Sequence, residues 1–186
     1  MAEAGADLDA KSELNGERAL HLAVNLSDTS TLELLLELGA NPNLPDNEGR
    51  SPLHSAAFLG DAKSISILLE HGAELEARDE RYGATPLSLA ALTGKLAAAQ
   101  ALAEAGADLE ARDDAGRTVL REAATMVSWS EVGGSDLIDF LVSAGADVNA
   151  REDNGRTILG WAEFRATVDP IYSKIADALR AHDALN

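Results

Sequence analysis

The sequence predicts an all-α solenoid in which short helix-turn-helix units stack side by side and long loops join them. A glycine-alanine signature, followed by an acidic residue or asparagine, recurs at Gly5, Gly39, Gly72, Gly106 and Gly145. A second signature of four residues, such as SPLH at Ser51 and TPLS at Thr85, recurs in the same phase. A fixed period of this length is typical of solenoids, because each unit buries its apolar face only against its neighbours.

Each unit predicts two helices and a long loop. In the second unit, Ser51 or its threonine equivalents cap the first helix, and Pro52 stands where its missing N–H costs nothing. Ile65 and Leu68 then return at helical spacing and form the apolar stripe of the second helix. Gly72 ends that helix, because glycine adopts a positive φ without steric penalty. The polar run ELEARDERYGA that follows carries turn residues and no apolar face.

On this template, residues 1–186 form one domain. We expect five helix pairs, which begin near Arg18, Ser51, Thr85, Thr118 and Thr157. The second helix of the third unit, KLAAAQALAEAG, offers mainly alanine to its neighbours, so this unit is either the tightest stack or the softest joint.

The two ends of the chain depart from the template. Asp169 and Pro170 open a C-terminal capping helix over about residues 170–182, because terminal units need a polar outer side. At the other end, the signature at Gly5 normally follows a helix pair, yet only MAEA precedes it. Either this first loop packs under Leu20 and Leu32, or a longer protein continues on the N-terminal side.

A period of about 33 residues with a T-P-L-H-x-A motif opening a helix pair resembles the ankyrin repeat. The segment SPLHSAAFLGDAKSISILLEHGAELEAR matches it best, and TPLSLAALTGKLAAAQALAEAGADLEAR nearly as well. The resemblance covers essentially the whole chain. It implies a stack whose first helices line a concave face, whose second helices form the convex back, and whose loops project as β-hairpin fingers. The alanine-rich composition, with arginine over lysine, is typical of a bacterial protein.

Composition excludes several classes of protein. With 15 basic and 32 acidic residues the net charge is −17, which argues against a nucleic-acid binder and favours a basic protein partner, although acidity also serves solubility. The absence of cysteine excludes a disulfide framework, a thiolate metal site and a cysteine nucleophile. Neither a signal peptide nor a membrane span is present in the sequence, so we expect a cytoplasmic protein without membrane contact.

Histidines give no support for catalysis. His21 and His54 occupy the H of T-P-L-H, where the resemblance implies a hydrogen bond between adjacent loops. His71 and His182 have no second ligand at metal spacing. No glycine-rich phosphate loop follows a strand. We therefore expect no enzyme activity, no cofactor and no metal.

The stretch TMVSWSEVGGSD, residues 125–136, makes the turn of the fourth helix pair longer than in the other units. Met126 and Trp129 place large apolar groups on a segment that is otherwise a short polar turn. Exposed tryptophans often anchor protein interfaces, so we interpret the insertion as an element that recognises the partner. The alternative is that Trp129 folds back over the core of its own unit.

The resemblance implies that positions which vary in the family carry the partner contacts, and several of these positions hold large side chains in this sequence. Phe58 and Phe164 follow the buried alanines of their first helices, and Tyr82 lies in a finger. We expect a stripe across the concave face formed by Phe58, Leu92, Met126 and Phe164. The candidate partner-binding residues are Phe58, Leu59, Arg81, Tyr82, Leu92, Thr93, Asp114, Arg117, Met126, Trp129, Phe164 and Arg165.

These observations predict a non-catalytic protein-protein interaction module, monomeric on its own, that binds its partner through the concave face, the fingers and the 125–136 insertion. One alternative is an inhibitor or immunity protein that neutralises a toxin or an enzyme by covering its active site. Another is a structural or self-associating scaffold.

Overall fold

The computed structural model describes residues 5–127, 134–153 and 155–182, with the side chains of 126, 127, 134 and 135 left out. Within these residues the chain forms ten helices and no strand, which confirms the predicted all-α solenoid. The first helices of successive pairs are α1 (Ala19–Asn25), α3 (Pro52–Leu59), α5 (Pro86–Leu92), α7 (Val119–Val127) and α9 (Ile158–Ala166). The second helices are α2 (Thr29–Glu37), α4 (Ala62–Glu70), α6 (Leu96–Glu104), α8 (Gly134–Ser143) and α10 (Ile171–Ala181).

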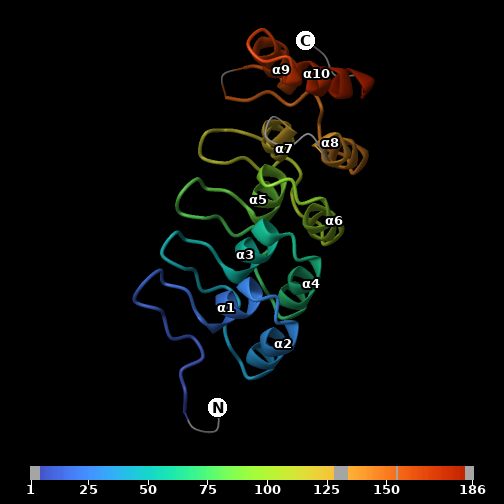
Figure 1. The fold of residues 1–186 in the computed structure, drawn as a ribbon. Helices are drawn as coiled ribbons and strands as arrows, with labels where there is room; N and C mark the ends of the chain where they lie inside the picture. Colours follow the sequence, from blue (N-terminus) through green and yellow to red (C-terminus); the bar gives the residue numbers. More distant parts are fainter. Residues whose placement is uncertain (1–4, 128–133, 154, 183–186) are drawn as a thin grey trace.

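The helices stand in two layers, with first helices in one and second helices in the other (Figure 1). The loops that connect one pair to the next, here called the fingers, project from the side of the first helices (Figure 1). The resemblance implies β-hairpins for them, but in the described residues their pairing is limited to two isolated bridges, Arg112 with Thr118 and Arg151 with Thr157. Short polar loops have too few backbone pairs to form a ladder.

Helix starts follow the local sequence. Thr85 Oγ1 accepts a hydrogen bond from Ser88 N at 3.2 Å and caps α5, and Thr157 caps α9 in the same way. Asp28 and Asp61 cap the second helices α2 and α4 with side-chain oxygens. These caps satisfy N–H groups that the first turn leaves without a partner.

The core is built from leucine and alanine. The leucine of the four-residue signature is buried in every unit, at Leu20, Leu53, Leu87, Leu120 and Leu159. In the third unit Ala98, Ala99 and Leu102 on α6 are fully buried. Complete burial of such small side chains requires close approach of the neighbouring helices, which favours the tight stack over the soft joint.

Two buried histidines connect the first and second units to the fingers that follow them. His21 Nε2 lies 2.9 Å from Arg50 O, and His54 Nε2 lies 3.1 Å from Ala84 O. The Nδ1 atoms accept from the backbone N–H of Arg18 and Ser51 at 3.2 Å. The neutral ring with its proton on Nε2 satisfies both bonds, and burial lowers the pKa of His21 and His54 below the ordinary 6.5.

We expect the free energy of unfolding to fall as the pH drops below about 6.5. The unfolded chain binds protons in this range that the buried imidazoles of His21 and His54 do not, because their folded pKa values are lower. Urea denaturation at several pH values between about 8 and 5.5 measures this slope. The variant His21→Ser, His54→Ser copies Ser88 of the third unit and should give a flatter profile. Equal slopes for both proteins contradict the prediction.

The first loop packs as a finger against the second. Asn47 N donates to Asn15 O at 3.1 Å, and Asn41 N donates to Asp9 Oδ1 at 3.0 Å. Leu8 is half-buried against the core. The packing expected for this first loop is therefore present in the structure.

Successive fingers are joined by backbone hydrogen bonds. Besides the bond from Asn47, Glu80 N donates to Glu48 O at 3.1 Å and Asp114 N donates to Tyr82 O at 2.8 Å. These bonds hold each of these fingers against the next. None of the helices in the described residues has the length and apolar character needed to cross a bilayer.

Candidate functional site

Two pockets open between the first helices and the fingers. We use the word groove for the surface of first helices and fingers on which both pockets lie. The larger, about 260 Å³, lies between α5 and α7 and is called the α5–α7 pocket. The smaller, about 200 Å³, lies between α1 and α3 and is called the α1–α3 hollow. Both occupy one place in the repeat: Asp46, Arg50 and Ser55 of the hollow stand where Asp113, Arg117 and Glu122 stand two units later.

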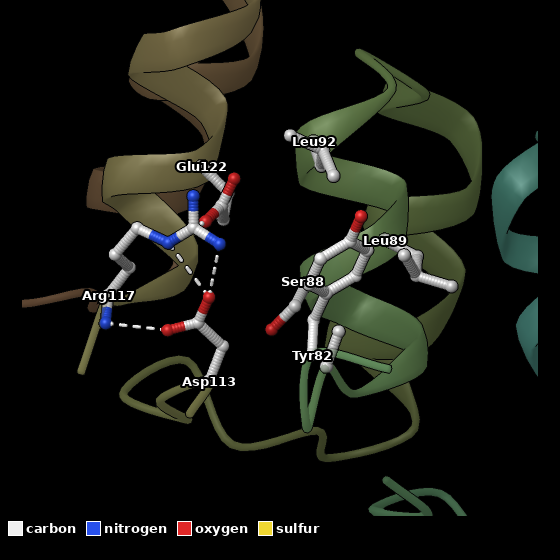
Figure 2. A pocket seen from close by; sticks show the side chains of 8 residues that line it. Tyr82, Ser88, Leu89, Leu92, Asp113, Arg117 and Glu122 are labelled. Carbon is white, nitrogen blue, oxygen red and sulfur yellow. Dashed lines mark hydrogen bonds and ion pairs between the residues drawn. The ribbon is translucent and has the colours of Figure 1, made fainter. Parts of the chain in front are cut away.

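The α5–α7 pocket has one apolar wall and one charged wall (Figure 2). Leu89 and Leu92 of α5 and the ring of Tyr82 form the apolar wall, and the charged wall comes from the next finger and from α7 (Figure 2). Its lining residues are Tyr82, Ala84, Ser88, Leu89, Leu92, Asp113, Arg117 and Glu122. By contrast, the α1–α3 hollow is lined by Glu17, Asn25, Asp46, Arg50, Ser55, Phe58 and Leu59.

Asp113 holds the charged wall in place. Its Oδ1 accepts from Ala115 N at 3.0 Å and Arg117 N at 2.9 Å, which fixes the finger turn. Its Oδ2 accepts from the Arg117 guanidinium through Nε at 2.8 Å and Nη2 at 2.5 Å. Asp46 closes its own finger with the same turn, and Asp79 closes a finger that is one residue longer by accepting from Tyr82 N and Ala84 N, so the recurrent finger aspartates are structural.

Glu122 is the unusual member of this wall. Its side chain is only 4% exposed, and its Oε1 lies 2.9 Å from Arg117 Nε. Neither of its oxygens accepts a hydrogen bond from the described part of the chain. Burial raises the pKa of Glu122 above the ordinary range, although Arg117 lowers it in part. A buried carboxylate that lines a pocket and accepts no hydrogen bond from the described residues indicates a functional position.

Arg121, next to it on α7, replaces the histidine of the repeat signature. Its Nε lies 2.8 Å from Glu152 Oε1 of the next finger; the Glu152 side chain is buried and that of Arg121 is mostly covered. The guanidinium also stacks on the ring of Trp161, 3.4 Å from the centroid. Burial lowers the pKa of Arg121 and the charge of Glu152 raises it. An ion pair therefore makes the link to the next finger that His21 and His54 make by hydrogen bonds.

Sequence reasoning missed Arg121, Glu122 and Glu152. The available signal was the fourth signature, TVLR followed by Glu122, which places an arginine and a glutamate where no other unit has an acidic, lysine or arginine side chain. Position 122 is leucine, serine, leucine and tryptophan in the other units, at Leu22, Ser55, Leu89 and Trp161.

Five of the predicted residues line the two pockets. Tyr82, Leu92 and Arg117 lie in the α5–α7 pocket, and Phe58 and Leu59 lie in the α1–α3 hollow. The exposed fractions of Phe58, Leu59 and Tyr82 are 47%, 42% and 42%, which is high for large apolar groups. Their role in binding stays a prediction.

Three other predicted residues are not among those that line the two pockets. Thr93, half-buried, ends α5, and its Oγ1 donates to Leu89 O at 2.7 Å. Arg81 stacks on Tyr82 at 5.0 Å from the ring centroid and lies 3.3 Å from Glu48 Oε1. Asp114 is exposed and lies 3.3 Å from Arg78 Nη2.

The last predicted residues lie away from the pockets. Phe164 is 55% exposed on α9, with Arg156 over its ring at 4.9 Å. Arg165 instead stacks on Tyr172 of α10 at 5.0 Å, so it packs on the terminal helix. Trp129 lies outside the described residues, as does the side chain of Met126, and both stay predictions.

Three of the four residues of the predicted apolar stripe share one position of the repeat. Phe58, Leu92 and Phe164 each stand seven residues after the first residue of their signature, at Ser51, Thr85 and Thr157, whereas Met126 stands eight residues after Thr118. Phe58 lies in the α1–α3 hollow, Leu92 lies in the α5–α7 pocket and Phe164 is exposed on α9. A continuous stripe through these residues stays a prediction.

The remaining histidines make local contacts. His71 Nδ1 lies 2.9 Å from Ile67 O at the end of α4, and His182 Nε2 lies 2.8 Å from Asp139 Oδ1. Within the described residues no three His, Asp or Glu side chains gather in a way that could hold a metal ion.

Comparison with known proteins places this geometry in a family. A family model described as ankyrin repeats in three copies matches residues 1–79 and 76–152. A crystal structure of an ankyrin repeat domain from Acinetobacter baumannii superposes with a TM-score of 0.82 at 29% identity, over 99% of this chain and 91% of that one.

Two curated relatives are similar over shorter stretches. They are the human neurogenic locus notch homolog protein 4, 44% identical over 52 residues, and protein 2, 46% identical over 48 residues. These matches cover 28% and 26% of this chain. They span only 3% and 2% of those two proteins.

Proposed function

Because this chain belongs to the ankyrin repeat family, we propose that it binds a partner protein through the groove and does not catalyse a reaction. Ankyrin repeats generally mediate protein-protein interaction and are typically non-catalytic. One observation supports the groove as the binding surface: Phe58, Leu59 and Tyr82 stand exposed around the two pockets, on the side where the fingers project.

Charge supports a basic partner. The net charge of −17 creates a negative field that speeds the approach of a positive surface. Within the groove, Glu17, Asp46, Asp113 and Glu122 line the pockets against Arg50 and Arg117. A partner with exposed lysines would gain from both the field and these contacts.

A capture experiment tests the proposal. The wild-type chain and the variant Phe58→Ala, Tyr82→Ala are immobilised and exposed to a lysate of the source cell. The matched control is Leu34→Ala, Leu38→Ala, which removes exposed apolar groups from α2 and its C-terminal end, outside both pockets. We expect a protein that the wild type and the control retain and that the groove variant loses at least tenfold, since truncated anchors cost 2 kcal/mol or about thirtyfold.

Equal retention by both variants would place the binding surface elsewhere and overturn the proposal. Loss only in the Leu34→Ala, Leu38→Ala variant would assign binding to the α2 side. Two further readouts separate the alternatives: an inhibitor or immunity protein abolishes the activity of the captured enzyme or toxin, and a scaffold shows concentration-dependent self-association in sedimentation.

A further inference from the structure

We propose that the α5–α7 pocket receives a lysine side chain of the partner, whose ammonium group pairs with Glu122 while its methylene stem packs on Tyr82, Leu89 and Leu92. This rests on the proposed function, since it names the chemistry that the groove recognises. A volume of about 260 Å³ lies below the range of small-molecule sites and suits one long side chain.

The geometry of Arg117 leaves Glu122 with unused acceptor capacity. Arg117 Nε carries one hydrogen, which it donates to Asp113 Oδ2 at 2.8 Å. Glu122 Oε1 lies 2.9 Å from the same nitrogen, so it has a charge contact but no aligned hydrogen bond. Oε2 of Glu122 also has no hydrogen-bond partner within the described residues. An ammonium group brings three donors and fills this deficit.

The balance of charge also favours a cation. The pocket holds two carboxylates, Asp113 and Glu122, against the single guanidinium of Arg117. Arg121 lowers the pKa of Glu122 and Glu152 raises it, and these two residues are paired with each other at 2.8 Å. An anionic ligand would have to displace Asp113 from Arg117, because Asp113 already accepts from two nitrogens of that guanidinium.

The repeat itself does not require a carboxylate at this place. The corresponding residues are Leu22, Ser55, Leu89 and Trp161, and those units build the same helix without a charge there. The fold does not need this buried charge, and the contact with Arg117 offsets only part of the free-energy cost of removing the carboxylate from water. A cationic ligand would account for its presence. The apolar wall then matches the stem of lysine, which buries its methylene groups while its end stays polar.

The test uses two peptides that differ only in the amine. The full-length protein is titrated with acetyl-Gly-Lys-Gly-amide and, separately, with acetyl-Gly-norleucine-Gly-amide, and the methyl signals of Leu89 and Leu92 are followed by NMR. We expect millimolar binding of the lysine peptide and at least about tenfold weaker binding of the norleucine peptide. Glu122→Gln should remove this difference, whereas Glu37→Gln, which removes the same charge from the exposed surface of α2, should keep it.

Leu92→Ala should weaken both peptides, because it removes part of the surface for the stem. Folding of each variant is checked by its thermal midpoint. If Glu122→Gln does not fold, Glu122→Ser takes its place, since Ser55 holds that position in the second unit.

Equal affinity for the two peptides, no shift at either leucine, or lysine binding unchanged by the loss of Glu122 would each overturn this inference. None of these results affects the capture experiment with Phe58 and Tyr82, so the proposed function is judged separately.

Discussion

Arg121→Ala is expected to lower the free energy of unfolding by about 3–5 kcal/mol, the usual loss when one partner of a buried ion pair is removed. The Arg121 side chain is 13% exposed and that of Glu152 is 7% exposed. Without the guanidinium, Glu152 keeps its buried charge but loses the cation 2.8 Å away. The ring of Trp161 also loses the group that covers its face.

Urea denaturation at pH 7, followed by circular dichroism, measures this loss. The control is Arg78→Ala, because the pair of Arg78 with Asp114 is 48% and 68% exposed and should contribute less than about 1 kcal/mol. The double variant Arg121→Met, Glu152→Met removes both charges and should recover most of the stability. A loss from Arg121→Ala as small as that of the control would show that the pair is not stabilising.

The periodicity of the sequence predicts the fold, because the repeat depends on positions that recur. Helices begin at Pro52 and its equivalents, pack through Leu53 and its equivalents, and end just before Gly72 and its equivalents. The spacing of these positions alone gives the order of the helices. His21 and His54 extend this to a specific contact, since a repeated polar residue at a buried position indicates a scaffold bond.

The candidate site could be predicted only in part, because it depends on departures from the repeat. Glu122 and Arg121 depart from the signature. A comparison that looks for the positions shared by all units does not detect them. Which atoms they meet depends on the next finger and on Trp161, which follow Arg121 by about one unit.

Gly49→Ala is expected to cost at least about 2 kcal/mol of stability, because it disturbs the junction between two fingers as well as the backbone. Gly49 has φ +77°, a conformation that alanine adopts only with strain. A Cβ there would lie 2.3 Å from Glu80 N. That nitrogen donates to Glu48 O at 3.1 Å, so the added carbon pushes apart the bond that joins the fingers.

Gly39→Ala separates the two causes. Gly39 has φ +92°, yet a Cβ at this position meets no atom within 4 Å. It should therefore cost only the strain of the left-handed conformation, about 1 kcal/mol. The larger loss in Gly49→Ala, together with faster hydrogen exchange at Glu80 N, would assign the difference to the finger junction; equal losses would contradict it. Because Arg81 and Tyr82 follow Glu80 directly, Gly49→Ala should also weaken capture of the partner by the groove.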